Sequence, residues 1–522
     1  MFSRRRLMVA AASLTALPAL PAFAASEKRA IALDLAKAAQ PVDRFFDLSI
    51  GSDYPGTLLR EDSLAQLKTA SDELKFRYIR FHAIFHDVLG TVKKGPDGKI
   101  VYDWTKIDQL YDRLLAMGLK PFIELGFTPE AMKTSDLTIF WWKGNTSHPQ
   151  FEPWAHLIDA FVTHLRKRYG EAEVRTWFFE VWNEPNLDGF WEKADQKVYF
   201  DLYALTAKTI KAIDPTLRVG GPSTAGAAWV PEFLAYCKAK GAAVDFVTTH
   251  TYGVEGGFLD ENGKDDTKLS ANPDAVIGDV RKVRAEIEAS AFPGLPLYFT
   301  EWSTSYTPRD PVHDSYHSAA YILAKLKGVK GIVQGMSYWT YSDLFEEPGP
   351  PTAPFQGGFG LMNPEGIRKP SWFAYKYLAA LRGKEIPSTD NSVLASLDGG
   401  RIAALVWDFS QPVQPTSNRS YFTKVQPAAD APGAALSVAG LKPGRYRLRT
   451  QRTGFRANDA YTAYIELGMP KSLTPEQVGQ LQALTADKPE VDKTITVAKD
   501  GVAKIDVALR QNDLVLVTLE RI

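Results

Sequence analysis

The sequence predicts a (β/α)8 barrel followed by a smaller β-sandwich domain, and three observations carry this prediction. Between residue 45 and about residue 380, short apolar runs alternate with amphipathic helical stretches, which is typical of a parallel sheet with helical crossovers. Eight such strand–helix units over roughly 300 residues match the size of a (β/α)8 barrel. Polar residues close several of the runs, as at the catalytic rim of a barrel, and this favours the barrel over a doubly wound sheet.

The eight strand candidates are rich in aromatic and β-branched residues and are bounded by Gly, Pro and polar clusters. They lie at residues 45–50, 76–82, 120–125, 175–182, 217–222, 245–250, 297–302 and 331–340. Three of the intervening helices have clear stop signals: 104–117 ends at Gly118, 154–169 at Gly170, and 197–213 before Asp214-Pro215. The barrel domain is therefore expected over residues 45–380.

Residues 381–522 are expected to form the β-sandwich. Short runs at 402–409, 446–450, 494–498 and 514–519 alternate apolar and polar residues between Gly, Pro and Asp. The stretch 474–484 is predicted as a lone helical insertion. The segment 25–44 precedes the barrel, and its apolar part, 29–35, is expected to pair with the sandwich strands.

Residues 1–24 have the pattern of an export signal. A basic start at 3–7, similar to the twin-arginine motif, precedes an apolar run at 7–20, and Ala22-Phe23-Ala24 fits a cleavage site. The run is too short for a stable membrane span. Cys237 is the single cysteine, so no disulfide can form within the chain, which suits a protein exported after folding. A periplasmic or secreted location is expected.

Composition limits the possible partners. Lys plus Arg and Asp plus Glu both number 61, so the formal net charge is zero. That balance argues against nucleic acid or an anionic membrane as a partner, and it leaves a neutral sugar possible. Aromatic residues make up 12% of the chain, which suits both carbohydrate stacking and a well-packed barrel.

Two strand candidates end in a glutamate beside tryptophan. The run Trp177–Trp182 leads into Asn183 and Glu184 and is stopped by Pro185, which cannot donate to a sheet. The run at 297–302 ends in Glu301-Trp302 in the same way. Two such strands in one barrel would place both carboxylates at one rim, where a carboxylate pair can cleave a glycosidic bond.

These motifs resemble those of glycoside hydrolase family 39, whose bacterial members are mostly β-xylosidases. The matching pieces are Phe179-Glu-Val-Trp-Asn-Glu-Pro-Asn-Leu187, Thr249-His-Thr-Tyr-Gly253, Phe299-Thr-Glu-Trp-Ser303 and Met336-Ser-Tyr-Trp-Thr-Tyr-Ser-Asp-Leu-Phe-Glu-Glu347. The resemblance implies a retaining enzyme with Glu184 as the acid/base and Glu301 as the nucleophile. It implies release of β-D-xylose from the non-reducing ends of xylo-oligosaccharides through a covalent glycosyl-enzyme.

The resemblance also implies a first sugar subsite built from strand ends. Asn183 would bind the sugar 2-hydroxyl, and the other candidates are Arg80, His82, His250, Tyr252, Trp339, Glu346 and Glu347. The physical alternative for such His and Arg residues is a buried structural network. No cofactor is expected, and no metal, since His82, His86 and His250 belong to no H-E-x-x-H or cysteine ligand pattern.

Aromatic pairs lie in the loops after the third and fourth strands, Trp141-Trp142 and Phe190-Trp191. They either stack on a leaving-group sugar or fasten the loops to the barrel. The alternatives for the activity are an α-L-iduronidase-like enzyme, an arabinosidase, an endo-glycanase, or a non-catalytic carbohydrate-binding protein. The iduronidase would need additional cations at the strand ends, the endo-enzyme an open groove, and a binding protein would have no use for both glutamates.

Overall fold

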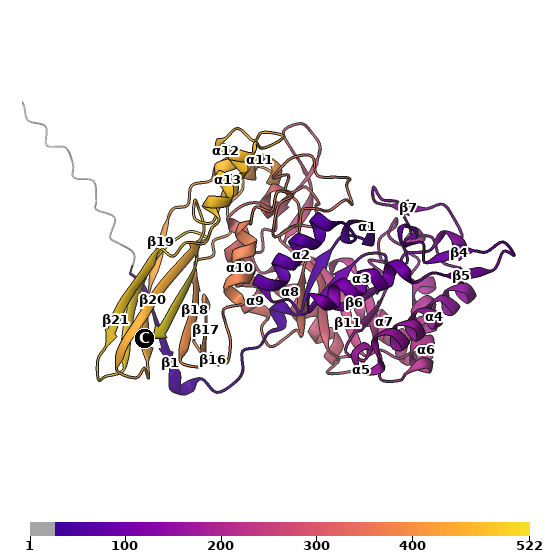
Figure 1. The fold of residues 1–522 in the computed structure, drawn as a ribbon, viewed down its shortest axis with the longest axis horizontal. Helices are drawn as coiled ribbons and strands as arrows, with labels where there is room; N and C mark the ends of the chain where they lie inside the picture. Colours follow the sequence, from indigo (N-terminus) through magenta and orange to yellow (C-terminus); the bar gives the residue numbers. More distant parts are fainter. Residues whose placement is uncertain (1–26) are drawn as a thin grey trace, which may run out of the picture.

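The computed structural model describes residues 27–522, and the expected export signal at 1–24 lies outside them. The described chain forms a barrel and a β-sandwich side by side, with the first strand of the chain among the last ones (Figure 1). Within residues 27–522, no helix is both long and apolar enough to cross a membrane.

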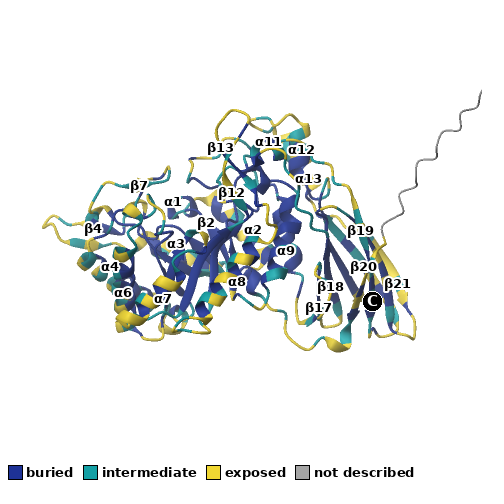
Figure 2. Cartoon of the chain, turned by 180° about the vertical axis from the view of Figure 1, so that it is seen from behind, coloured by how far each residue is buried: buried dark blue, intermediate teal, exposed yellow. Residues whose placement is uncertain are grey.

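Eight parallel strands close into the barrel, and each neighbours the next one along the chain. They are β2 (Ser49–Ser52), β3 (Tyr78–Phe81), β6 (Lys120–Leu125), β9 (Phe178–Val181), β10 (Arg218–Thr224), β11 (Phe246–Tyr252), β14 (Leu297–Ser303) and β15 (Gly335–Tyr338). The predicted (β/α)8 barrel is confirmed. Figure 2 shows these strands as the buried centre of the domain.

One long helix follows each barrel strand and covers it from outside. The helices are α2 (Glu61–Leu74), α3 (Thr105–Ala116), α4 (Phe151–Tyr169), α6 (Gln196–Ile213), α7 (Val230–Lys240), α8 (Ala275–Glu288), α9 (His317–Val329) and α10 (Pro370–Leu378). The predicted stop signals hold for α3 and α4. Gly118 and Gly170 follow these helices with φ of 79° and 87°, which glycine adopts without the strain of a side chain.

Short helices and strands lie in the loops of the barrel. They are α1 (Pro55–Leu58), β4 (Val92–Lys94), β5 (Ile100–Tyr102), β7 (Thr138–Ile139), β8 (Gly144–Asn145), α5 (Glu171–Val174), β12 (Val254–Leu259) and β13 (Asp265–Leu269). The predicted bounds of the first and last strands were wrong. Phe45–Asp47 is a buried 3-10 turn whose first amide donates to the side chain of Asp43, and β15 spans only part of the expected 331–340.

The second domain is a sandwich of a six-stranded and a three-stranded sheet. The six strands are β16 (Lys384–Ile386), β17 (Val393–Asp398), β18 (Arg401–Trp407), β23 (Leu514–Arg521), β20 (Gly444–Thr453) and β21 (Val491–Val497). The other three are β1 (Arg29–Asp34), β19 (Asp430–Ala439) and β22 (Val502–Arg510). β1 pairs in parallel with β19, and its buried Ile31 and Leu33 join a core that includes Leu436 and Val517. The N-terminal segment thus completes the sandwich, as expected.

The sandwich carries three short helices, so the expectation of a lone helical insertion was wrong. α13 (Pro475–Leu484) matches the predicted stretch and begins with a capping box between Thr474 and Gln477. α11 (Asn418–Phe422) and α12 (Ala460–Glu466) were not predicted. α11 contacts β13, so this part of the sandwich reaches over to a barrel loop (Figure 2).

Candidate active site

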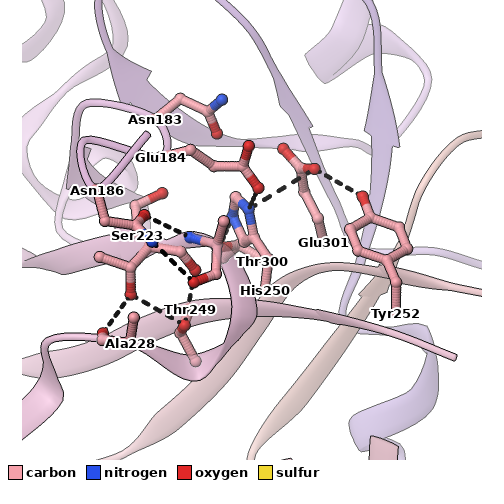
Figure 3. Close-up of polar contacts among 12 residues, drawn as sticks. Asn183, Glu184, Asn186, Ser223, Ala228, Thr249, His250, Tyr252, Thr300 and Glu301 are labelled. Atoms are coloured by element: carbon pink, nitrogen blue, oxygen red, sulfur yellow. Dashed lines mark hydrogen bonds and ion pairs between the residues drawn. The ribbon is translucent and has the colours of Figure 1, made fainter. Parts of the chain in front are cut away.

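Glu184 and Glu301 face one another at the carboxyl ends of β9 and β14 (Figure 3). One oxygen of each carboxylate and a ring nitrogen of His250 lie within 4.8 Å of one another. Both glutamates are buried, with relative exposures of 8% and 5%. Two carboxylates from distant parts of the sequence therefore share one nearly enclosed site at a single rim of the barrel.

The chain reaches this position through unusual backbone conformations. Trp182 and Glu184 have φ of 72° and 47°, in the left-handed region that non-glycine residues rarely adopt. The Glu184 amide donates to the carbonyl of Ser223 at 2.8 Å, and Ser223 itself has φ of 55°. Such conformations persist where surrounding contacts hold them, and they cluster at functional sites. The ends of β9 and β10 thus hold each other in place beneath Glu184.

Arg80, on β3, connects the two sides of the site. Its Nη1 donates to Oε1 of Glu301 at 2.8 Å, and its Nη2 donates to Oδ1 of Asn183 at 2.8 Å. Its Nε donates to Glu180 at 2.5 Å, and Glu124 lies 3.1 Å away. A fully buried guanidinium is tolerated only when carboxylates compensate its charge. Arg80 therefore orients the carboxylate of Glu301 and the amide of Asn183 together.

The second oxygen of Glu301 also has a donor. The hydroxyl of Tyr252 donates to Oε2 of Glu301 at 2.8 Å. Burial raises the pKa of Tyr252 well above its ordinary value, and the neighbouring Glu301 carboxylate raises it further. The phenol therefore keeps its proton, and both oxygens of Glu301 accept a hydrogen bond.

Glu184 has a different environment. Burial raises its pKa to about 7, while His82 and Arg80 partly offset that effect. Its Oε1 lies 2.8 Å from Nδ1 of His250. Burial lowers the pKa of His250 to about 4, so this imidazole is neutral near pH 7. Glu184 is thus suited to hold a proton near neutral pH, whereas both oxygens of Glu301 accept hydrogen bonds from Arg80 and Tyr252.

His82, at the end of β3, bridges two further acids. Its Nδ1 lies 2.7 Å from Glu124 and its Nε2 lies 3.0 Å from Glu347. Burial raises the pKa of Glu347 to about 8. The ring of Trp339 lies 4.7 Å from that of His82, so Trp339 and Glu347 from the β15 side and His82 from β3 form one wall. Glu346 instead accepts a hydrogen bond from Nη1 of Arg60 at 2.7 Å.

The loop aromatics divide into two groups. Trp142 and Trp191 are buried, and each indole donates a hydrogen bond inside the protein, to Asp53 and to the Asp195 carbonyl respectively. These two fasten their loops. Trp141 is 55% exposed and its amide donates to the Glu347 carbonyl at 2.8 Å. Trp141 therefore remains the candidate for sugar stacking beside the mouth of the site.

Glu184, His250 and Glu301 are also side chains of metal-ligating types. Their facing atoms already have protein partners: Glu184 and His250 contact each other, and Glu301 receives Arg80 and Tyr252. The guanidinium already supplies the positive charge that a cation would bring. The arrangement fits an acid–base site better than a metal site.

Sequence reasoning missed three buried residues of the site, Glu124, Glu180 and Thr300. The barrel register pairs Glu124 with Glu180, and both contact Arg80. A signal was present, because a glutamate inside an apolar strand such as Phe122–Leu125 must find a cation when it is buried. Thr300 carried no such signal, since threonine is common in strands.

The geometry can be set beside known proteins. The family model of glycosyl hydrolases family 39 matches residues 29–504. A β-xylosidase of Caldicellulosiruptor saccharolyticus is 35% identical over 498 residues, which are 94% of this chain and 98% of that protein.

Solved structures of two members of the same family are also similar to this chain. A monomeric β-xylosidase from Caulobacter crescentus CB15 is 71% identical, with a TM-score of 0.93 over 95% of this chain and 100% of that one. A GH39 enzyme from Xanthomonas axonopodis pv. citri is 64% identical, with a TM-score of 0.95 over 96% of this chain and 100% of that one. The chain belongs to glycosyl hydrolases family 39, and it is a glycoside hydrolase.

Proposed function

We propose that this protein is a retaining, exo-acting β-xylosidase that releases β-D-xylose from the non-reducing ends of xylo-oligosaccharides. The observation that carries the proposal is the pair Glu184 and Glu301, with facing atoms within 4.8 Å. Retaining glycosidases hold their carboxyl groups about 5–5.5 Å apart, whereas inverting enzymes separate them by about 6.5–9.5 Å. The short spacing supports double displacement through a covalent glycosyl-enzyme.

The two environments support the assignment of roles. Glu301, held by Arg80 and Tyr252, attacks the anomeric carbon and forms the glycosyl-enzyme. Glu184, whose pKa is raised to about 7 by burial, protonates the departing oxygen. It then takes a proton from water, which hydrolyses the intermediate.

Asn183 is placed to act on the sugar 2-hydroxyl. Its Oδ1 accepts from Nη2 of Arg80 at 2.8 Å, which leaves the amide NH2 to donate. A hydrogen bond to the 2-hydroxyl strengthens in the oxocarbenium-like transition state. Arg80 therefore orients this amide in the same way that it orients Glu301.

A neutral sugar fits the site better than an iduronate does. An iduronate would need a cation for its carboxylate, and Arg80 is already engaged by Glu180, Glu301 and Asn183. The relatives from Caldicellulosiruptor saccharolyticus and Caulobacter crescentus CB15 are named β-xylosidases, which supports the same substrate.

Export to the periplasm or the medium is part of the proposal. The basic start and the Ala22-Phe23-Ala24 site support it, as does the single cysteine, Cys237. Xylo-oligosaccharides released outside the cytoplasm would then be accessible to the enzyme.

A panel of aryl glycosides tests the activity. Purified protein is assayed with nitrophenyl β-xyloside, α-L-arabinoside, β-glucoside and α-L-iduronide, and the anomer first released from the best substrate is identified by NMR. We expect the highest kcat/KM on the β-xyloside, and β-xylose as the first product. A preference for the iduronide or first release of α-xylose contradicts the proposal. The Glu301→Ala variant is the control for contaminating glycosidases.

A further inference from the structure

The ring of His250 connects the carboxyl of Glu184 to the hydroxyl of Thr300. Nδ1 of His250 lies 2.8 Å from Oε1 of Glu184, and Nε2 lies 3.2 Å from Oγ1 of Thr300 (Figure 3). His250 and Thr300 are 0% and 1% exposed. Each ring nitrogen therefore has one hydrogen-bond partner. Which nitrogen carries the proton depends on whether the Thr300 hydroxyl donates a hydrogen bond to Nε2 or accepts one from it.

Thr300 can only accept a hydrogen bond from His250. A hydroxyl has one proton, and that of Thr300 is donated to Oε1 of Glu180 at 2.7 Å. Glu180 accepts at its other oxygen from Nε of Arg80 at 2.5 Å, so both of its oxygens act as acceptors. The Thr300 oxygen thus presents a lone pair to Nε2 of His250.

His250 therefore carries its proton on Nε2. Nδ1 of His250 lies 3.7 Å from the carboxylate of Glu301, but burial lowers the pKa of His250 to about 4 and outweighs this nearby carboxylate, so the imidazole is neutral near pH 7. A neutral imidazole has a single N–H, and donation from Nε2 to Thr300 leaves a lone pair on Nδ1. The 2.8 Å contact between Nδ1 and Glu184 is then a hydrogen bond only when Glu184 is protonated.

We propose that Thr300 is a positioning residue for acid/base catalysis: it selects the Nε2–H tautomer of His250, and the tautomer makes Glu184 the donor of the pair. The inference rests on the proposed function, in which Glu184 is the acid/base. Thr300 would thus keep Glu184 protonated through His250, without contacting the substrate itself.

The proton can be followed through both steps. In the first, the Glu184 carboxyl turns about its last side-chain torsion, which is broad, and its proton passes to the glycosidic oxygen while Glu301 bonds the anomeric carbon and the bond between that carbon and the glycosidic oxygen breaks. In the second, water gives a proton to Glu184 while its oxygen bonds the anomeric carbon and the ester to Glu301 opens. The lone pair on Nδ1 of His250 favours the return of the proton to Glu184.

The experiment compares Thr300→Val, which removes the hydroxyl at equal size, with Thr300→Ser, which keeps it. Without the hydroxyl, His250 is free to move its proton to Nδ1 and donate to ionised Glu184. We expect the basic limb of the kcat/KM profile on xylobiose to move to lower pH by about one unit in Thr300→Val, and to stay in place in Thr300→Ser. The other titratable groups that face Glu184, namely Glu301, His82, Arg80 and Glu124, are the same in all three proteins.

A second measurement determines the tautomer of His250 directly. Nitrogen-15 NMR of histidine-labelled protein distinguishes a proton on Nε2 from a proton on Nδ1. The His250→Asn variant identifies the signals of His250 among those of the eight histidines. We expect Nε2–H in the wild type and in Thr300→Ser, and Nδ1–H in Thr300→Val. Nδ1–H in the wild type would overturn the proposal.

The outcomes separate this inference from the proposed function. A merely structural Thr300 would lower kcat/KM in Thr300→Val at every pH without moving the limb, and that result contradicts the inference alone. A dinitrophenyl xyloside, whose leaving group needs no proton, should show no shifted limb in its glycosylation step. If instead Glu184→Ala leaves xylobiose hydrolysis unchanged, Glu184 is not the acid/base, and the proposed roles fail first.

Discussion

The hydroxyl of Tyr252 lies 2.8 Å from Oε2 of Glu301, opposite the guanidinium that holds the other oxygen of the same carboxylate. We expect Tyr252→Phe to lower kcat/KM on aryl xylosides by about 10–100-fold, because a hydrogen bond to a charged group is lost at the reacting carboxylate. Tyr306→Phe is the matched control, since Tyr306 is 48% exposed and its ring lies 6.3 Å from that of Tyr252. Equal effects in the two variants would exclude a specific role for the Tyr252 hydroxyl.

Glu184 should make the protein less stable as pH rises. Its folded-state pKa is raised to about 7 from 4.5, so the folded protein binds more protons than the unfolded chain between these values. The stability that the neutral carboxyl contributes is complete below pH 4.5 and is lost as pH rises through about 7. Glu184→Gln keeps the shape and removes the titration, so its melting temperature should match the wild type near pH 4.5 and exceed it at pH 8.

The size of this effect is bounded by the shift itself. The change in pKa corresponds to about 3 kcal/mol at most. Glu232→Gln, at an exposed position of α7, is the control and should give the same small difference at both pH values. A Glu184→Gln variant whose melting temperature exceeds that of the wild type by no more at pH 8 than at pH 4.5 would contradict the raised pKa of Glu184.

Neighbouring tryptophans should behave in opposite ways. Trp142 is buried, stacks on Tyr54 with ring centroids 4.6 Å apart and donates to Asp53, so Trp142→Ala should cost about 3–5 kcal/mol of stability. Trp141 is exposed, so Trp141→Ala should change stability by less than about 0.5 kcal/mol.

Trp141→Ala should act on the substrate instead. We expect a higher KM for xylotriose. The KM for an aryl xyloside should be unchanged if its leaving group is too short to reach Trp141. Thermal melting and initial-rate kinetics on both variants check these expectations. Loss of stability in Trp141→Ala would show that this side chain also fastens its loop.

The position of Glu184 and Glu301 could be predicted because active sites of (β/α)8 barrels lie at the carboxyl-terminal ends of the strands. Glu184 and Glu301 each close a short apolar strand, and the carboxyl ends of parallel strands meet at one face. No residue spacing was needed, since the topology alone brings the two glutamates together.

The network around the pair could not be predicted, since it depends on register. β11 pairs with β14 so that His250 lies beside Glu301, and β6 pairs with β9 so that Glu124 lies beside Glu180. The division between Trp141 and Trp142 was equally hidden, because adjacent loop residues follow no helical or strand period. The short α11 and α12 were missed because helices of five and seven residues depend on tertiary contacts rather than on propensity.

Kinetic measurements on Glu184→Ala and Glu301→Ala, without and with azide, distinguish the roles of the two glutamates. Glu301→Ala removes the nucleophile, so activated and unactivated xylosides should both lose nearly all turnover. Glu184→Ala removes only the proton donor. A dinitrophenyl xyloside hardly needs protonation and should still form the glycosyl-enzyme, whereas xylobiose should react about 10²–10⁴-fold more slowly. Deglycosylation then lacks its base, so the intermediate should accumulate as a burst.

Azide then identifies each face of the sugar. In Glu184→Ala the anion enters the space of the missing side chain, attacks the glycosyl-enzyme without deprotonation and should give β-xylosyl azide with retained configuration. In Glu301→Ala it should attack from the opposite face and give the α-azide. Product anomers are assigned by proton NMR. An α-azide from Glu184→Ala together with a β-azide from Glu301→Ala would reverse the roles, because each anomer reports which side of the anomeric carbon lost its carboxylate.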